Sequence, residues 1–356
     1  MVLLFPRSPA KVILPVLDKP NYNGLDWLKF ATALLVVANH TGPLHAYHAY
    51  ADFLLSGVLT RIAVPLFFMS TGFFFFRKLS GDPSKDHSAF LAYIKKITVL
   101  YGIAILLYLP LNVYKGYFSE SFTPLALLKD LIFNGTFYHL WYLPALIIGL
   151  GLTYAMYRKM SLPKLLMIGV CLYSIGLLGD SYYGLTVRAA GLHQLYESMF
   201  LVFDYTRNGI FYAPIYIMLG AYAAKRPAPA IKPKGNASLF FLGLVLMLAE
   251  GILLKAAEYP RHDSMYVFAL PAAYFLFQWA LSWNASSGKA FREWRVWIYI
   301  LHPIAIVLVR GAAEAAKLET LFIANSVMHF VTVCLVSVVM AAAAVRLSVI
   351  KFKFRP

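Results

Sequence analysis

The chain has 356 residues, of which 60% are hydrophobic and 13% are charged, and its formal net charge at pH 7 is +16. A soluble domain carries about 25% charged residues, so this composition argues against a soluble protein and favours a polytopic membrane protein. The basic residues are spread between apolar segments rather than gathered in one domain, which argues against nucleic-acid binding. Both cysteines lie in apolar runs without metal-ligand spacing, so no metal is expected.

Ten apolar segments predict an all-α membrane protein of about ten transmembrane helices. No internal repeat supports an inverted-repeat transporter. The predicted helices span residues 25–40, 56–76, 90–111, 138–157, 162–179, 208–224, 237–256, 265–283, 295–311 and 321–346.

The connections between these segments do not indicate a second domain. Residues 1–22 are broken by prolines and lack a cleavage site, so we expect a short cytoplasmic or interfacial lead rather than a signal peptide. Residues 112–137 include an amphipathic run, PLALLKDLIF, and residues 225–236 are rich in Pro and Lys and predict an extended cytoplasmic linker. The whole chain, 1–356, is therefore predicted to be a single transmembrane domain.

Lysine and arginine are distributed unequally between the two sides of this predicted topology. With the N-terminus in the cytoplasm, 22 of the 32 basic residues fall in inner segments and nine in outer segments. The positive-inside rule then places both termini in the cytoplasm. Ten of the 16 acidic residues fall outside, so the basicity belongs to the inner face, where it would also attract a polyanion such as a nucleotide or coenzyme.

Two ionisable residues mark the two ends of the first apolar segment, LDWLKFATALLVVANH. Lys29 and His40 are eleven residues apart, and over that distance a helix rises about 16.5 Å and turns about 1100°, so both lie on one face. Because an ionisable residue in a membrane is costly, we expect this face to line the bundle interior or a water-filled cavity. A neutral imidazole suits removal of a hydroxyl proton at neutral pH, and a lysine suits anion binding. The opposing interpretation is that His40 caps the helix among the headgroups while Lys29 snorkels, paired with Asp26.

The stretch GLDWLKFATALLVVANH, in which ten residues separate a basic residue from a histidine, resembles the first-helix signature of the acyltransferase 3 family of membrane acyltransferases. Three later stretches are similar to family blocks in the same order: RIAVPLFFMSTGFFF at 61–75, YHLWYLPALI at 138–147 and WIYILHPIAI at 297–306. Two more, GLLGDSYYGL at 176–185 and DYTRNGIFYAPIYIMLG at 204–220, look closest to the membrane domain of vancomycin-resistance serine racemases. No stretch resembles a soluble racemase domain, so racemisation is not implied.

The resemblance implies transfer of a short acyl group, usually acetyl, from cytoplasmic acyl-CoA to a hydroxyl of an extracytoplasmic acceptor such as an envelope glycan. It implies that His40 is the catalytic base and that Lys29 lies near the thioester or pantetheine passage. The donor would be acetyl-CoA, without a metal, and the protein would be a multi-pass protein of the bacterial cytoplasmic (inner) membrane. The expected partners are acyl-CoA, the hydroxyl acceptor and the lipid bilayer.

Two positions depart from the family pattern. The family commonly has Ser-Gly-Phe in the second helix, where this chain has Thr71 before Gly-Phe. The third helix usually opens with Arg-x-x-Arg, where this chain has only Lys95 and Lys96. We assign both lysines to donor binding, although lysine binds phosphate as a point charge without the bidentate fork of arginine.

Further candidates, for acceptor binding, lie mainly at the outer ends of the predicted helices. Arg61 has a structural alternative as a snorkelling anchor. His139 and Trp141 have one as part of an interfacial aromatic belt, and His302, before Pro303, has one as a satisfied structural residue. Glu250 lies within a predicted span and needs a partner or a proton. The candidates are Arg61, His139, Trp141, Arg207, Asn208 and His302.

The first hypothesis is therefore a membrane O-acyltransferase. The alternative from a different class is a transporter of a small polar solute such as serine, favoured by the likeness to the racemase-linked branch and by ionisable groups along helix faces. A third is a noncatalytic membrane scaffold. An enzyme requires His40, a transporter should tolerate its loss better than the loss of Arg61 or Glu250, and a scaffold should tolerate either.

Overall fold

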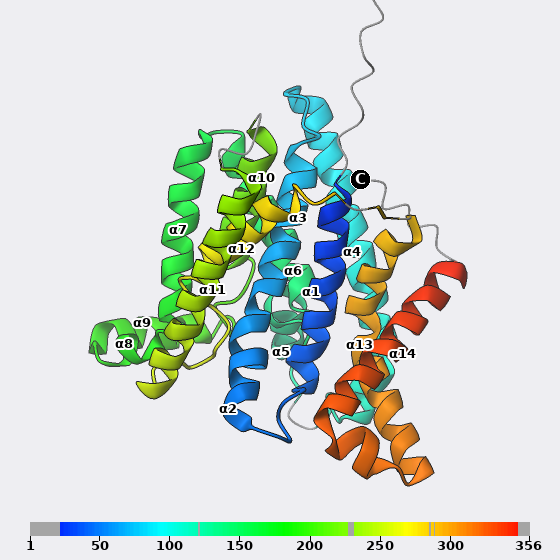
Figure 1. Ribbon diagram of the computed structural model, residues 1–356. Helices are drawn as coiled ribbons and strands as arrows, with labels where there is room; N and C mark the ends of the chain where they lie inside the picture. The colour runs from blue at the N-terminus through cyan, green and yellow to red at the C-terminus, as the bar shows by residue number, and fades with distance from the viewer. Residues whose placement is uncertain (1–21, 120–121, 227–230, 285, 288, 348–356) are drawn as a thin grey trace, which may run out of the picture.

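The computed structural model describes residues 22–347 except 120–121, 227–230, 285 and 288. The described residues form helices and turns without a strand, as predicted, and the long helices run beside one another as a bundle (Figure 1). The helices are α1 (Asn23–Thr41), α2 (Ala49–Asp52), α3 (Ala63–Phe76), α4 (Pro83–Tyr114), α5 (Pro124–Lys129), α6 (Tyr142–Tyr157), α7 (Leu162–Leu178), α8 (Tyr183–Val187), α9 (Ala190–Phe200), α10 (Ala213–Lys225), α11 (Pro233–Ala256), α12 (Ala269–Ala280), α13 (Lys289–Ala316) and α14 (Ser326–Leu347). Shorter π and 3₁₀ turns are η1 (Phe53–Val58), η2 (Leu59–Ile62), η3 (Asp130–Asn134) and η4 (Thr320–Ala324).

Each of the ten predicted segments contains a helix. Within the described ranges, five helical segments are long and apolar enough to cross a membrane: Ala49–Phe76, Pro83–Tyr114, Pro233–Ala256, Phe291–Ala316 and Ser326–Leu347. Helices α6 and α7 are apolar but shorter, so the count of ten spans stays a prediction. Leu106 on α4, Leu253 on α11 and Val339 on α14 are 69%, 69% and 66% exposed, as expected of helix faces that contact lipid.

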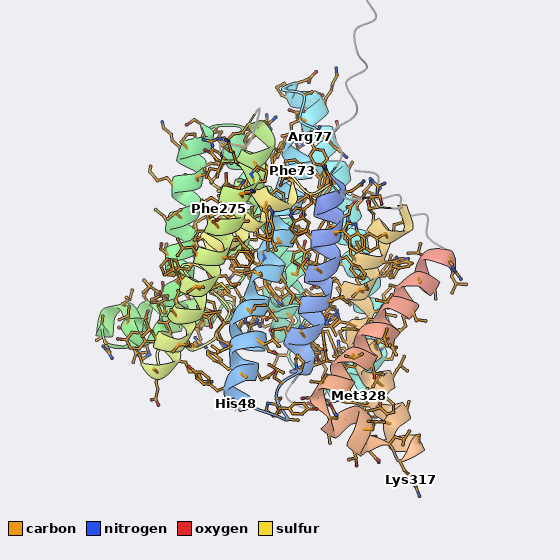
Figure 2. All side chains as sticks on the ribbon, in the orientation of Figure 1. His48, Phe73, Arg77, Phe275, Lys317 and Met328 are labelled. Atoms are coloured by element: carbon orange, nitrogen blue, oxygen red, sulfur yellow. The ribbon has the colours of Figure 1, made fainter. Side chains whose placement is uncertain are left out.

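The two described ends of the chain lie at the same end of the bundle, which we name the terminal end. Helix α1 begins there and α14 ends there (Figure 1). Phe73 and Arg77 lie toward this end, whereas His48, Met328 and Lys317 lie at the opposite end (Figure 2). The predicted topology requires this same-sided arrangement, and the cytoplasmic location of the terminal end remains a prediction.

Local sequence signals set several helix boundaries. Pro83 occupies the first turn of α4, and the Asp82 side chain accepts the N–H groups of Ser84 and Lys85, a typical N-cap. Helix α1 ends where Gly42 adopts a left-handed conformation at φ 56°.

The structure also describes parts of two predicted connections, 112–137 and 225–236. The amphipathic run PLALLKDLIF forms α5 and the turn η3. Helix α11 begins at Pro233, within the predicted linker 225–236, while 227–230 and the predicted lead 1–21 lie outside the described residues.

Helices α3 and α10 approach each other closely because each has a glycine at their crossing. A Cβ atom added to Gly72 would lie 2.0 Å from the carbonyl oxygen of Ile217, and one added to Gly220 would lie 2.0 Å from that of Met69. Small residues at helix crossings permit such contact in membrane proteins. The crossing fixes α3 and α10 in the core of the bundle.

Candidate active site

Lys29 and His40 both face the protein interior, as their spacing on α1 predicted. Two cavities lie along this helix. The inner cavity, nearer the terminal end, has a volume of about 730 Å³ and is lined by Lys29, which is only 4% exposed. The outer cavity has a volume of about 310 Å³ and is lined by His40.

The inner cavity carries an excess of positive charge. Asp26 lies among the cations, with its Oδ1 atom 2.6 Å from Nη1 of Arg295 and 3.6 Å from Nζ of Lys29. Glu293 is the second carboxylate of the lining. Because cations outnumber carboxylates, the cavity is suited to a polyanion. The described cations that line it are Lys29, Lys78, Lys96, Arg292 and Arg295.

Of the two lysines assigned to donor binding, the structure brings only one to the cavity. Lys96 lines it, whereas Lys95 is exposed and does not, so donor binding by Lys95 stays a prediction without support from the cavity. Successive residues of a helix point about 100° apart, and on α4 this separation turns Lys95 away from the surface that Lys96 presents to the cavity. Arg292 and Arg295 were missed, although their Arg-x-x-Arg spacing places them one turn apart on α13.

The outer cavity brings His40 close to other aromatic rings. The centroid of its imidazole lies 4.7 Å from the ring of Tyr138 and 5.3 Å from the ring of His302. Arg61 lines the same cavity from η2, where its Nη2 atom pairs with Oδ1 of Asp263 at 2.9 Å and its Nε donates to the carbonyl of Gly57 at 3.0 Å. The predicted place of Arg61 in the site is thus observed, with a partner that the sequence did not indicate.

Arg207 also lines the outer cavity, together with Trp141. Its guanidinium carbon lies 5.2 Å from the ring centroid of Trp141 and 4.4 Å from that of Tyr205, which are cation–π distances. Its Nε atom is buried and has no hydrogen-bond acceptor among the described residues.

The two predicted histidines occupy different positions. His139 lines the outer cavity, and neither of its ring nitrogens has a hydrogen-bond partner in the described part of the chain. His302 is fully buried behind His40 and is not a lining residue. Its Nδ1 lies 2.8 Å from the carbonyl oxygen of Tyr299, the oxygen that Pro303 leaves without its helical N–H donor. His302 therefore carries the Nδ1 proton and stabilises the helix where proline interrupts it.

Asn208 does not line the outer cavity, so the structure gives its predicted role in acceptor binding no support. Its side-chain oxygen accepts the N–H groups of Ile210 and Phe211, and its amide donates to the carbonyl of Tyr205. These contacts shape the turn that precedes α10. Asn208 thus supports the backbone next to Arg207.

Tyr142 and Tyr299 line both cavities. Their ring centroids are 5.4 Å apart, and the Tyr299 hydroxyl donates to the carbonyl of His139. The polar track predicted along α1 therefore consists of two cavities that meet at two tyrosine rings.

A buried acid supports the loop before α12, which carries Asp263. Asp180 is fully buried, and its Oδ1 accepts the N–H groups of Ser264 and Met265 at 2.8 and 2.9 Å. Burial raises the pKa of Asp180 to about 6, against the opposing effect of these hydrogen bonds. In the same loop, burial lowers the pKa of His262 to about 4, with a further contribution from nearby arginines.

Glu250 has the partners that its place in a predicted span required. It accepts hydrogen bonds from the Tyr182 hydroxyl at 2.8 Å and from the N–H groups of Val267 and Phe268 at 2.7 and 2.9 Å. These contacts join α11 to the start of α12, which is a structural role.

Comparison with known proteins identifies the family to which the chain belongs. Residues 22–346 match the model of a family described as an acyltransferase domain. Two amino-acid racemases of Enterococcus faecalis are 38% and 35% identical, over 90% and 91% of this chain and 44% and 46% of their own lengths. A serine/alanine racemase of Enterococcus gallinarum is 31% identical over 88% of this chain and 45% of its own length. The chain thus spans about half the length of these relatives, and no solved structure matches it.

Proposed function

Because this chain belongs to the acyltransferase 3 family, we propose that it moves a short acyl group, such as acetyl, from acyl-CoA to a hydroxyl of an acceptor on the opposite side of the membrane. The single observation that carries the proposal is the pair of cavities along α1, cationic at the terminal end and lined by His40 at the other. The terminal end would face the cytoplasm of a bacterium, where the positive-inside rule places it. The acceptor would be an envelope glycan or another hydroxyl compound.

The inner cavity would bind the donor. The phosphates of acyl-CoA are multiply charged, and Arg292, Arg295 and Lys96 offer them guanidinium and ammonium groups. Asp26 pairs with both arginines, with its Oδ2 3.6 Å from Arg292 Nε and its Oδ1 2.6 Å from Arg295 Nη1, and so restrains two cations that lie one turn apart on α13. The thin pantetheine arm would then pass between the rings of Tyr142 and Tyr299.

His40 would act as general base in the outer cavity. The helix rise over the eleven residues from Lys29 is about 16.5 Å, a length that an extended pantetheine arm can bridge. His40 takes the proton of the acceptor hydroxyl, the hydroxyl oxygen bonds to the acyl carbonyl carbon, and the C–S bond breaks. The proton then passes from the imidazolium to the thiolate of CoA, so that charge and atoms balance.

The test is a comparison of two histidine variants in purified, detergent-solubilised protein. Release of free CoA from acetyl-CoA, with water as the acceptor, is followed by thiol titration. His40→Ala is expected to slow this release by about 10²- to 10⁴-fold, the usual contribution of a general base. His45→Ala, a change at an exposed loop histidine, is the matched control and is expected to retain the rate. Equal rates for the two variants would contradict the proposal.

Racemisation, the reaction named for the relatives, is not part of this proposal. The chain spans about half of those proteins, and their names do not say which half carries the reaction.

A further inference from the structure

The outer cavity contains a cation, Arg207, that forms no direct ion pair within the described residues, although Asp180 and Asp263 lie near enough to favour its charge. Arg61 and Arg207 are its two described arginines, and no aspartate or glutamate lines it. Arg61 is paired with Asp263, whereas no carboxylate of the described residues lies within ion-pair distance of Arg207. The two arginines therefore differ in what they can still bind.

The residues around Arg207 hold its guanidinium in place but leave its Nε without a hydrogen-bond acceptor in the part of the chain that the structure describes. Aromatic rings of Trp141 and Tyr205 contact its guanidinium, and its Nε is buried without an acceptor. Asp180, the buried acid nearby, uses one oxygen for the backbone of the loop before α12. Arg207 is partly buried and its Nε has no acceptor within the described residues, so a ligand anion that pairs with the guanidinium would replace the water it has lost.

We infer that the acceptor is a hydroxyl compound that carries a carboxylate, and that Arg207 binds the carboxylate while His40 faces the hydroxyl. Both side chains line one cavity of about 310 Å³, which accommodates a small hydroxy acid or a single sugar acid. A guanidinium pairs with a carboxylate through two parallel hydrogen bonds, so it fixes orientation as well as charge. The role of the hydroxyl rests on the proposed function, whereas the carboxylate site is tested without any acyl donor.

The experiment measures binding of matched ligand pairs to the purified protein by isothermal calorimetry in the absence of acyl-CoA. Glyceramide has a neutral carboxamide where glycerate has its carboxylate, and glucose has a neutral hydroxymethyl group where glucuronate has its carboxylate. Charged members are expected to bind about 10- to 100-fold more tightly than neutral members, the usual effect of a charge-assisted pair. A stronger preference in the sugar pair would assign the acceptor to a glycan, and a stronger preference in the glycerate pair to a free hydroxy acid.

Two variants then locate the site. Arg207→Gln is expected to remove most of the preference for the charged ligands, and Arg207→Lys to retain part of it because the charge remains without the fork. Arg188→Gln is the matched control, since Arg188 also stacks on a tyrosine, Tyr259, but lies outside the outer cavity. The control is expected to keep the full preference.

The inference is overturned if the unmodified protein binds glycerate no more tightly than glyceramide and glucuronate no more tightly than glucose. It is also overturned if both Arg207 variants keep the preference. Neither result bears on acetyl-CoA hydrolysis by His40, so failure of this inference and failure of the proposed function are distinguishable.

Discussion

The contact between α3 and α10 predicts a large response to one added methyl group. In Gly72→Ala the new Cβ would lie 2.0 Å from the carbonyl oxygen of Ile217, whereas ordinary contact begins at 3.4 Å. The two helices must therefore separate by more than 1 Å at their crossing. Overpacking of this kind costs about 1–3 kcal/mol. For soluble domains of 150–250 residues each kcal/mol shifts Tm by about 2–4 °C, so we expect a decrease of roughly 2–12 °C.

A second glycine provides the control for this prediction. Gly151 lies in α6, and a Cβ added to it would meet no atom within 4 Å. Gly151→Ala should therefore leave Tm unchanged or raise it slightly, because alanine favours the helix by up to about 1 kcal/mol. Thermal unfolding in detergent, followed by intrinsic fluorescence, measures both variants. If Gly72→Ala melts at or above the temperature of Gly151→Ala, the close crossing is incorrect.

Further predictions concern the inner cavity and the outer loop. Lys96→Gln should raise the KM for acetyl-CoA about 3- to 10-fold while Lys95→Gln leaves it unchanged, since only the first lysine lines the cavity. The raised pKa of Asp180, about 6, means that the folded state binds more protons, so this residue lowers stability as pH rises from about 4 to 6, by up to about 3 kcal/mol. The lowered pKa of His262, about 4, has the opposite sign, and its contribution is lost as pH falls from about 6.5 to 4. Relative to the unmodified protein, Tm measured from pH 4 to 7 should therefore rise more steeply with pH in Asp180→Asn and less steeply in His262→Gln, and slopes parallel to that of the unmodified protein would refute both assignments.

Helical periodicity was enough to predict the arrangement of α1. Lys29 and His40 share a face because the helix repeats every 3.6 residues, and an ionisable residue in an apolar segment is stable only where the protein encloses it. The same reasoning gave the ten helical segments. Glu250 likewise has the partners that its burial required.

Contacts between distant segments could not be predicted in this way. Asp26 and Arg295 are 269 residues apart in the chain, and no local pattern indicates that one binds the other. The direction in which the Arg61 side chain points depends on the π turn η1 and the 3₁₀ turn η2. These turns rotate the following side chains differently from an α-helix, and no sequence pattern indicates where they occur. Asn208 was assigned to binding because it lies beside Arg207, but a turn directs adjacent side chains to different surroundings.

The meeting of two tyrosine rings between the cavities has a bioenergetic consequence. A membrane enzyme that joined both compartments by a continuous file of water would let protons leak and would dissipate the voltage that the cell maintains. With Tyr142 and Tyr299 packed 5.4 Å apart, apolar ring surface interrupts such a file. The pantetheine arm of the proposed donor would part the rings and fill the gap that it makes, so the proposed transfer would not open a path for protons.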